Sequence, residues 1–228
     1  MYGNSWLDKL DRKCGRHALR NLMTIIVIGT GIVWLLDMVV GMRAGVSIIG
    51  WLTFNSAAIL QGQVWRVITF VFVPETYSLF TLAITLYFYW LIGNSLENEW
   101  GSFKFDLFYL GGVLGAVISG FITGYATNYY LNLSLFLAFA LLYPDHQVLI
   151  FFFLPIKIKY LAILDLVGLV LIFILSGWTQ RIALIMALVN VAFFFGHLMF
   201  GKIRAAHRRR KWKRQAARKD DKNYPFDL

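Results

Sequence analysis

The chain has 228 residues, of which 59% are apolar and only 15% are charged, and its mean hydropathy is +0.64. Soluble domains average about 45–50% apolar and about 25% charged residues, so this composition excludes an ordinary soluble protein. The net charge is +10, and the single cysteine, Cys14, excludes an intrachain disulfide. These values indicate an integral membrane protein.

Six apolar runs approach or exceed the roughly 18–20 residues that a helix needs to cross a bilayer. We predict an all-α polytopic membrane protein with spans at 21–40, 76–93, 103–124, 128–143, 160–176 and 182–201. Three regions follow from these spans: an N-terminal segment (1–20), a six-helix membrane domain (21–201) and a basic tail (202–228).

The segment between the first two spans, residues 41–75, is too long for a hairpin loop and too apolar for a solvated one. Trp51 and Trp65 suit the membrane interface, where an aromatic ring has one wet edge and one dry face. We therefore expect a structured first loop that lies partly in the membrane beside the bundle. In the later loop 144–159, Pro144 and Pro155 break any helix.

The basic residues predict the orientation, because Lys and Arg accumulate on cytoplasmic loops. Of the 22 Lys and Arg residues, all except Arg43, Arg66 and Arg181 fall on one side of the predicted membrane. Both termini are therefore expected in the cytoplasm. No secretory signal peptide is visible, which favours a bacterial inner (plasma) membrane, with the endoplasmic reticulum as the alternative.

The basic tail includes the run "HRRRKWKRQAARK" at 207–219. Such a run binds anionic lipid headgroups at a membrane surface. We expect this role in addition to the topology signal, and we expect no nucleic-acid partner. The sequence leaves the oligomeric state open.

Three segments together resemble the rhomboid family of intramembrane serine proteases. They are "GQVWRVITFVFVP" (62–74), "GNSLENEWGSFKFDLFYLGG" (93–112) and "PIKIKYLA" (155–162). The resemblance implies a rhomboid-like bundle of six spans with a long first loop. It also implies structural roles for the motif residues Trp65, Arg66, Gly93, Glu97, Gly101 and Gly201.

Rhomboid proteases pair a serine with a histidine base and support the oxyanion with a second His and an Asn, because a serine hydroxyl is a weak nucleophile without a base. When the motifs are aligned on Gly93, Pro144, Gly196 and Gly201, all four catalytic positions are substituted. The resemblance places these positions at Tyr129 (nucleophile), Phe194 (base), Thr81 and Thr85 (oxyanion support). It therefore implies a pseudoprotease.

One shifted catalytic pair is possible, between Ser134 and His197. At roughly 1.5 Å per residue, their depths in the membrane differ by about 7–8 Å, whereas proton transfer needs contact at about 2.6–3.2 Å. Intramembrane polar residues are functional candidates by default, so Asn132, Asn190 and Asp165 are also candidates. No residue cluster indicates a metal or a cofactor.

Three hypotheses remain open. The first is a catalytically inactive, rhomboid-like protein that binds transmembrane helices of other membrane proteins. The second is an active intramembrane serine endopeptidase that uses the pair Ser134 and His197. The third is a transporter or lipid-handling protein, which would need a continuous polar path through the membrane.

Overall fold

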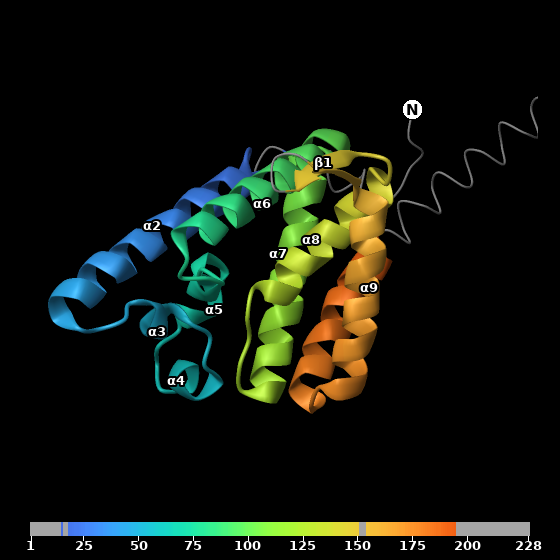
Figure 1. Ribbon diagram of the computed structural model, residues 1–228. Coiled ribbons are helices and arrows are strands. Elements are labelled where there is room, and N and C mark those ends of the chain that lie inside the picture. Colours follow the sequence, from blue (N-terminus) through green and yellow to red (C-terminus); the bar gives the residue numbers. More distant parts are fainter. Residues whose placement is uncertain (1–14, 16–17, 151–153, 195–228) are drawn as a thin grey trace, which may run out of the picture.

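The computed structural model describes residue 15 and residues 18–150 and 154–194 (Figure 1). Two candidates from the sequence, His197 and Gly201, lie outside these residues, as does the basic tail.

Helices form at all six predicted spans. Four are long and apolar enough to cross a membrane: α2 (Leu22–Ala44), α6 (Leu79–Trp100), α7 (Ser102–Thr123) and α9 (Ile158–Leu175). Two apolar helices are shorter, namely α8 (Tyr129–Leu142) and the helix Trp178–Phe194, which reaches the last described residue. The all-α polytopic class is confirmed for the spans, whereas the count of six spans stays a prediction.

Helix α6 continues to Trp100, although its predicted span ended at residue 93. The last turns carry Asn94, Glu97 and Glu99, which lower the local hydropathy without breaking the helix. The apolar run in the sequence therefore predicted only the apolar part of the helix and not its whole length. Gly101, with a φ of 85°, ends α6 and leads directly into α7.

Helix α8 lies at the centre of the bundle, where it packs against α6, α7 and α9 (Figure 1). Helices α2 and α6 run side by side, and α6 in turn contacts α7 and α8. The contact between α2 and α6 is close at Gly93, where an added Cβ would lie 2.3 Å from the Cγ atom of Met23. The core contains fully buried side chains such as Phe105, Leu135 and Phe139.

The first loop is ordered into short elements, as expected for a structured insertion. They are α3 (Ile49–Leu52), α4 (Ser56–Leu60), α5 (Arg66–Thr69) and the 3-10 helix η2 (Phe70–Phe72). Phe54 has no exposed surface and packs on Gly120 of α7, where an added Cβ would lie 2.5 Å from the Phe54 ring. We call this end of the bundle the first-loop end.

The opposite end carries a β-hairpin, which the all-α prediction missed. Strands β1 (Gln147–Ile150) and β2 (Leu154–Lys157) pair antiparallel. Val148 and Ile156 are β-branched, which favours the extended backbone. Pro155, which cannot donate to the ladder, is tolerated because this small sheet has only edge strands. We call this end the hairpin end.

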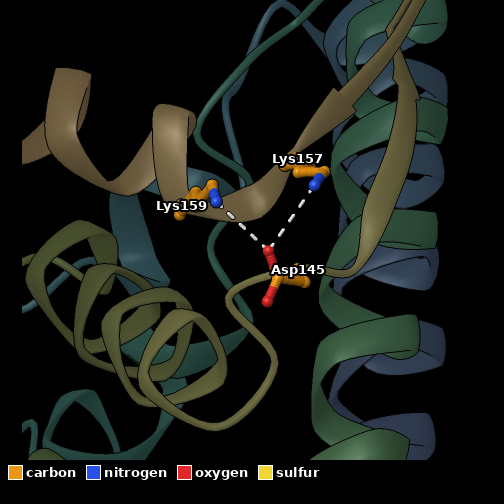
Figure 2. Close-up of polar contacts among 3 residues, drawn as sticks. All are labelled: Asp145, Lys157 and Lys159. Atoms are coloured by element: carbon orange, nitrogen blue, oxygen red, sulfur yellow. Dashed lines mark hydrogen bonds and ion pairs between the residues drawn. The ribbon is translucent and has the colours of Figure 1, made fainter.

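Asp145, in the turn before β1, ties the hairpin to α9 (Figure 2). Its Oδ1 lies 3.2 Å from Lys159 Nζ and 3.7 Å from Lys157 Nζ. The hydrogen bond from Lys159 and the two positive charges hold the pKa of Asp145 below its usual range. All three side chains are exposed, so the pair contributes little to stability.

Candidate functional site

A cavity of about 300 Å³ opens between α7, the first turns of α8 and the helix Trp178–Phe194. From Gly112 to Thr123, both of which line it, α7 rises about 16 Å at roughly 1.5 Å per residue. The cavity therefore extends from the first-loop end deep into the bundle. Its volume is at the lower limit of the range for ligand pockets.

Small residues at four-residue spacing line two walls of the cavity. Gly112 and Ala116 line it on α7, and Ala183 and Ala187 line it on the last helix. Small residues four apart normally let two helices approach closely in a membrane. Here both sets line one cavity, and within the wall on α7 Gly112 already accommodates the side chains of Leu131 and Asn190.

Two buried serines bring hydroxyl groups to the cavity. Ser134 is 1% exposed and donates to the Leu131 carbonyl at 2.7 Å. Ser119 is also 1% exposed, and its Oγ has no hydrogen-bond partner within the described part of the chain. An unpartnered buried hydroxyl is costly, so a polar group that reaches Ser119 would be stabilising.

The cavity lining offers no base to Ser134. None of the described lining residues is a histidine, an acid or a lysine, and the polar ones carry only hydroxyl or amide groups. His197 lies outside the described residues, so the structure places only one member of the predicted pair.

The residues at the substituted positions separate into different environments. Tyr129 and Tyr130 line the cavity and form an edge-to-face pair with ring centroids 5.2 Å apart. Phe194 packs instead on Trp100 and Phe108, with both centroid distances at 5.1 Å. Thr81 is exposed on α6, and Thr85 is half-buried one turn further along.

Asn132 takes part in a polar network beside the cavity. Its Nδ2 donates to Oε1 of Glu75 at 2.9 Å, and the Tyr89 hydroxyl donates more weakly to the same carboxylate at 3.3 Å. Asn128, one turn earlier, donates to the carbonyls of Val71 and Val73. Helix α8 thus holds the end of the first loop with two asparagines.

Asn190 and Asp165 lie apart from this network. Asn190 donates from Nδ2 to the Phe108 carbonyl at 3.3 Å, and Gly111 and Gly112 leave space for its side chain. Asp165 is half-buried in α9, and its Oδ2 has no hydrogen-bond partner among the described residues. Lys159, at the start of the same helix, bonds to Asp145.

The motif residues of the first loop make local contacts. Arg66 is 8% exposed and donates from Nη1 to the Gly50 and Thr53 carbonyls and from Nε to Gln63 Oε1. Trp65 donates from its ring nitrogen to the Trp51 carbonyl at 3.2 Å. These bonds tie α5 to the segment around α3, and therefore fix the shape of the first loop.

Glu97 lies at the hairpin end. Its Oε1 accepts hydrogen bonds from the Asn21 backbone N–H at 2.9 Å and from the Ser102 hydroxyl at 2.6 Å. It thus joins the start of α2 to the start of α7. No group of three or more metal-ligating side chains occurs in the described ranges.

A comparison with known protein families shows to which family the chain belongs. A model of the family described as "Eukaryotic integral membrane protein (DUF1751)" matches residues 20–211. The chain belongs to this family. A search of curated proteins finds no match.

This match corrects two predictions. The family is a eukaryotic one in the rhomboid-like clan and is not the rhomboid family, so the assignment to rhomboids is wrong. A bacterial inner membrane is wrong for the same reason. That prediction was based on the lack of a visible secretory signal peptide, a feature that does not separate bacterial from eukaryotic membrane proteins.

Sequence reasoning missed Glu75 and Ser119. Glu75 lies in a loop, where a carboxylate alone does not indicate a functional site. Its partner Asn132 is 57 residues away in the sequence. Ser119 lies within an apolar helix, where its hydroxyl commonly bonds back to the preceding turn. Only the three-dimensional packing shows that Ser119 lacks such a partner.

Proposed function

We propose that this integral membrane protein binds transmembrane segments of other membrane proteins without cleaving them, and that the cavity between α7, α8 and the last helix receives them. The observation that supports this proposal is the pair of small-residue walls that line one open cavity. A partner helix at the cavity mouth can insert side chains between these walls, since small residues permit close approach.

The polar groups of the cavity favour a partner segment of low polarity that carries one hydrogen-bonding side chain. Ser119 offers an unpartnered hydroxyl, and interhelical hydrogen bonds of this kind contribute about 1 kcal/mol in lipid. The lining carries no acidic or basic side chain among its described residues, so the cavity itself suits an uncharged segment.

The absence of cleavage in this proposal rests on Ser134. Its hydroxyl donates to the backbone of its own helix, and a nucleophile needs a base that removes this proton. In liposomes with a helix-destabilised transmembrane peptide, we expect no peptide fragments from the wild type. Fragments that disappear with Ser134→Ala would contradict this part of the proposal.

Site-specific photo-crosslinking tests the place of binding. A benzophenone amino acid at Tyr130, which lines the cavity, is compared with one at Phe173, which is 42% exposed on α9. The probe is a Leu/Ala peptide of about 20 residues, long enough to span a bilayer. It carries one Asn near the terminus that lies on the same side of the membrane as the first-loop end of the protein. We expect crosslinks from position 130 that exceed those from position 173. Equal crosslinking at both would indicate random encounter in the membrane.

A further inference from the structure

A second hollow adjoins the cavity at the segment 125–129. This groove, of about 480 Å³, shares Tyr125, Ala126, Thr127 and Tyr129 with the cavity. Its remaining walls come from the first loop and include Phe70 and Glu75. The cavity and the groove therefore adjoin each other at the first-loop end.

Glu75 is the only charged residue among the described residues that line the groove. Its carboxylate is held in place by Asn132 and Tyr89, both of which donate to it. No cationic side chain of the described residues forms an ion pair with it. A carboxylate beside a membrane domain normally has a positive partner, and this one has none within the described chain.

Aromatic side chains complete the chemistry of the groove. Tyr125 and Tyr129 line it and are 56% and 40% exposed. Aromatic faces attract ammonium and guanidinium groups, and a nearby carboxylate strengthens this attraction. The combination of one carboxylate and two accessible tyrosines is suited to an organic cation.

We infer that the groove binds a lysine or arginine side chain that directly flanks the transmembrane segment of the bound partner. This inference rests on the proposed function, and it adds the class of partner: a membrane protein with a basic residue at the first-loop end of its span. The cavity and the groove share Tyr125, Ala126, Thr127 and Tyr129, so a partner segment in the cavity has its flanking residue beside the groove.

Charge-swapped pairs test this inference. The probes are three Leu/Ala peptides of about 20 residues with one Asn near the first-loop end, followed there by Lys, Gln or Glu. Their affinities for the full-length protein are measured in phosphatidylglycerol-free liposomes by fluorescence energy transfer. For the wild type, we expect the Lys peptide to bind roughly three- to tenfold more tightly than the Gln peptide, as for a partly exposed ion pair.

Three variants make the test specific. Glu75→Gln keeps an acceptor for Asn132 and Tyr89, and it should bring the Lys and Gln peptides to equal affinity. Glu75→Lys should prefer the Glu peptide, a reversal that a merely structural role would not produce. Glu99→Lys, which changes an exposed carboxylate at the other end of α6, should leave the wild-type preference unchanged.

Each failure has a distinct meaning. If all three peptides bind the wild type equally, the inference is overturned and the proposed function stands. If none of them binds, the proposed function fails and the inference fails with it. In a third outcome, the peptide charge has no effect on binding, whereas replacing the choline and ethanolamine lipids by uncharged lipids changes it. A lipid headgroup then occupies the groove, and the inference is overturned.

Discussion

Asn132 donates a hydrogen bond to Glu75 at 2.9 Å and thereby joins the central helix α8 to the segment between η2 and α6. The bond orients a carboxylate that has no positive partner in the described chain. It also links the cavity wall to the groove wall, because Glu75 lines the groove and α8 lines the cavity.

The protonation of Glu75 predicts how binding depends on pH. Surrounding protein atoms withdraw the carboxylate from water and raise the pKa of Glu75 above 4.5, although the hydrogen bonds from Asn132 and Tyr89 oppose this shift. Only the ionised form attracts a cation. The preference for the Lys peptide should therefore be fully present well above this raised pKa and should be lost as the pH falls through it.

The neighbours of Glu75 do not disturb this measurement. Tyr89 and Tyr129 are its titratable neighbours on α6 and α8, and tyrosine stays neutral well below pH 10. The ratio of Lys-peptide to Gln-peptide affinity is measured from about pH 8 down to about pH 4, a range that includes the ordinary pKa of a glutamate and the values above it. In Glu75→Gln the ratio should be flat, and an equally steep loss in that variant would assign the titration to another group.

Gly120 on α7 allows the first loop to dock. An alanine Cβ there would lie 2.5 Å from the ring of Phe54, which has no exposed surface into which it can move. We expect Gly120→Ala to lower the free energy of unfolding by about 1–3 kcal/mol through overpacking. Thermal unfolding in detergent micelles gives the value.

Gly168 on α9 provides the matched control, since an added Cβ there meets nothing within 4 Å. Gly168→Ala should be neutral or should stabilise by up to about 1 kcal/mol, because alanine favours a helix over glycine. A similar loss of stability in both variants would show that helix backbone effects, and not the contact with Phe54, determine the result.

The guanidinium of Arg66 holds the first loop together. Arg66→Ala removes its hydrogen bond to Gln63 and leaves the Gly50 and Thr53 carbonyls without this donor. We expect a loss of about 3 kcal/mol, as for a buried charged donor. Arg43→Ala, at the exposed end of α2, should cost less than about 1 kcal/mol. Equal losses would mean that the bonds of Arg66 contribute no more than a surface charge.

The sequence located the helices because hydropathy is a local property of the chain. It failed where the structure depends on distant partners. Residues 144–159 contain helix-breaking prolines, but the register that pairs Val148 with Ile156 became visible only in three dimensions. The extension of α6 past Gly93 contains Asn94, Glu97 and Glu99, polar residues that end an apolar run without ending the helix.

The candidate site was predictable only in part. Asn132 stood out as a polar residue in an apolar run, and Tyr129 stood out through the resemblance. The role of Glu75 depends on a contact across 57 residues. Phe194 was expected in the same space as Tyr129, yet it packs on Trp100 near the hairpin end, because helix depth set by counting residues does not define which neighbour a side chain meets.

The central claim is that the cavity receives a segment of a partner protein, and filling the cavity tests it most directly. Ala183→Leu adds bulk to the small-residue wall, whereas Val189→Leu adds one methylene at a position that is 53% exposed on the same helix. Affinity for the Lys-flanked peptide is measured in liposomes for both variants and the wild type. We predict at least about tenfold weaker binding for Ala183→Leu, equivalent to about 1.4 kcal/mol, and unchanged binding for Val189→Leu. Unchanged binding in a folded Ala183→Leu protein would contradict the account.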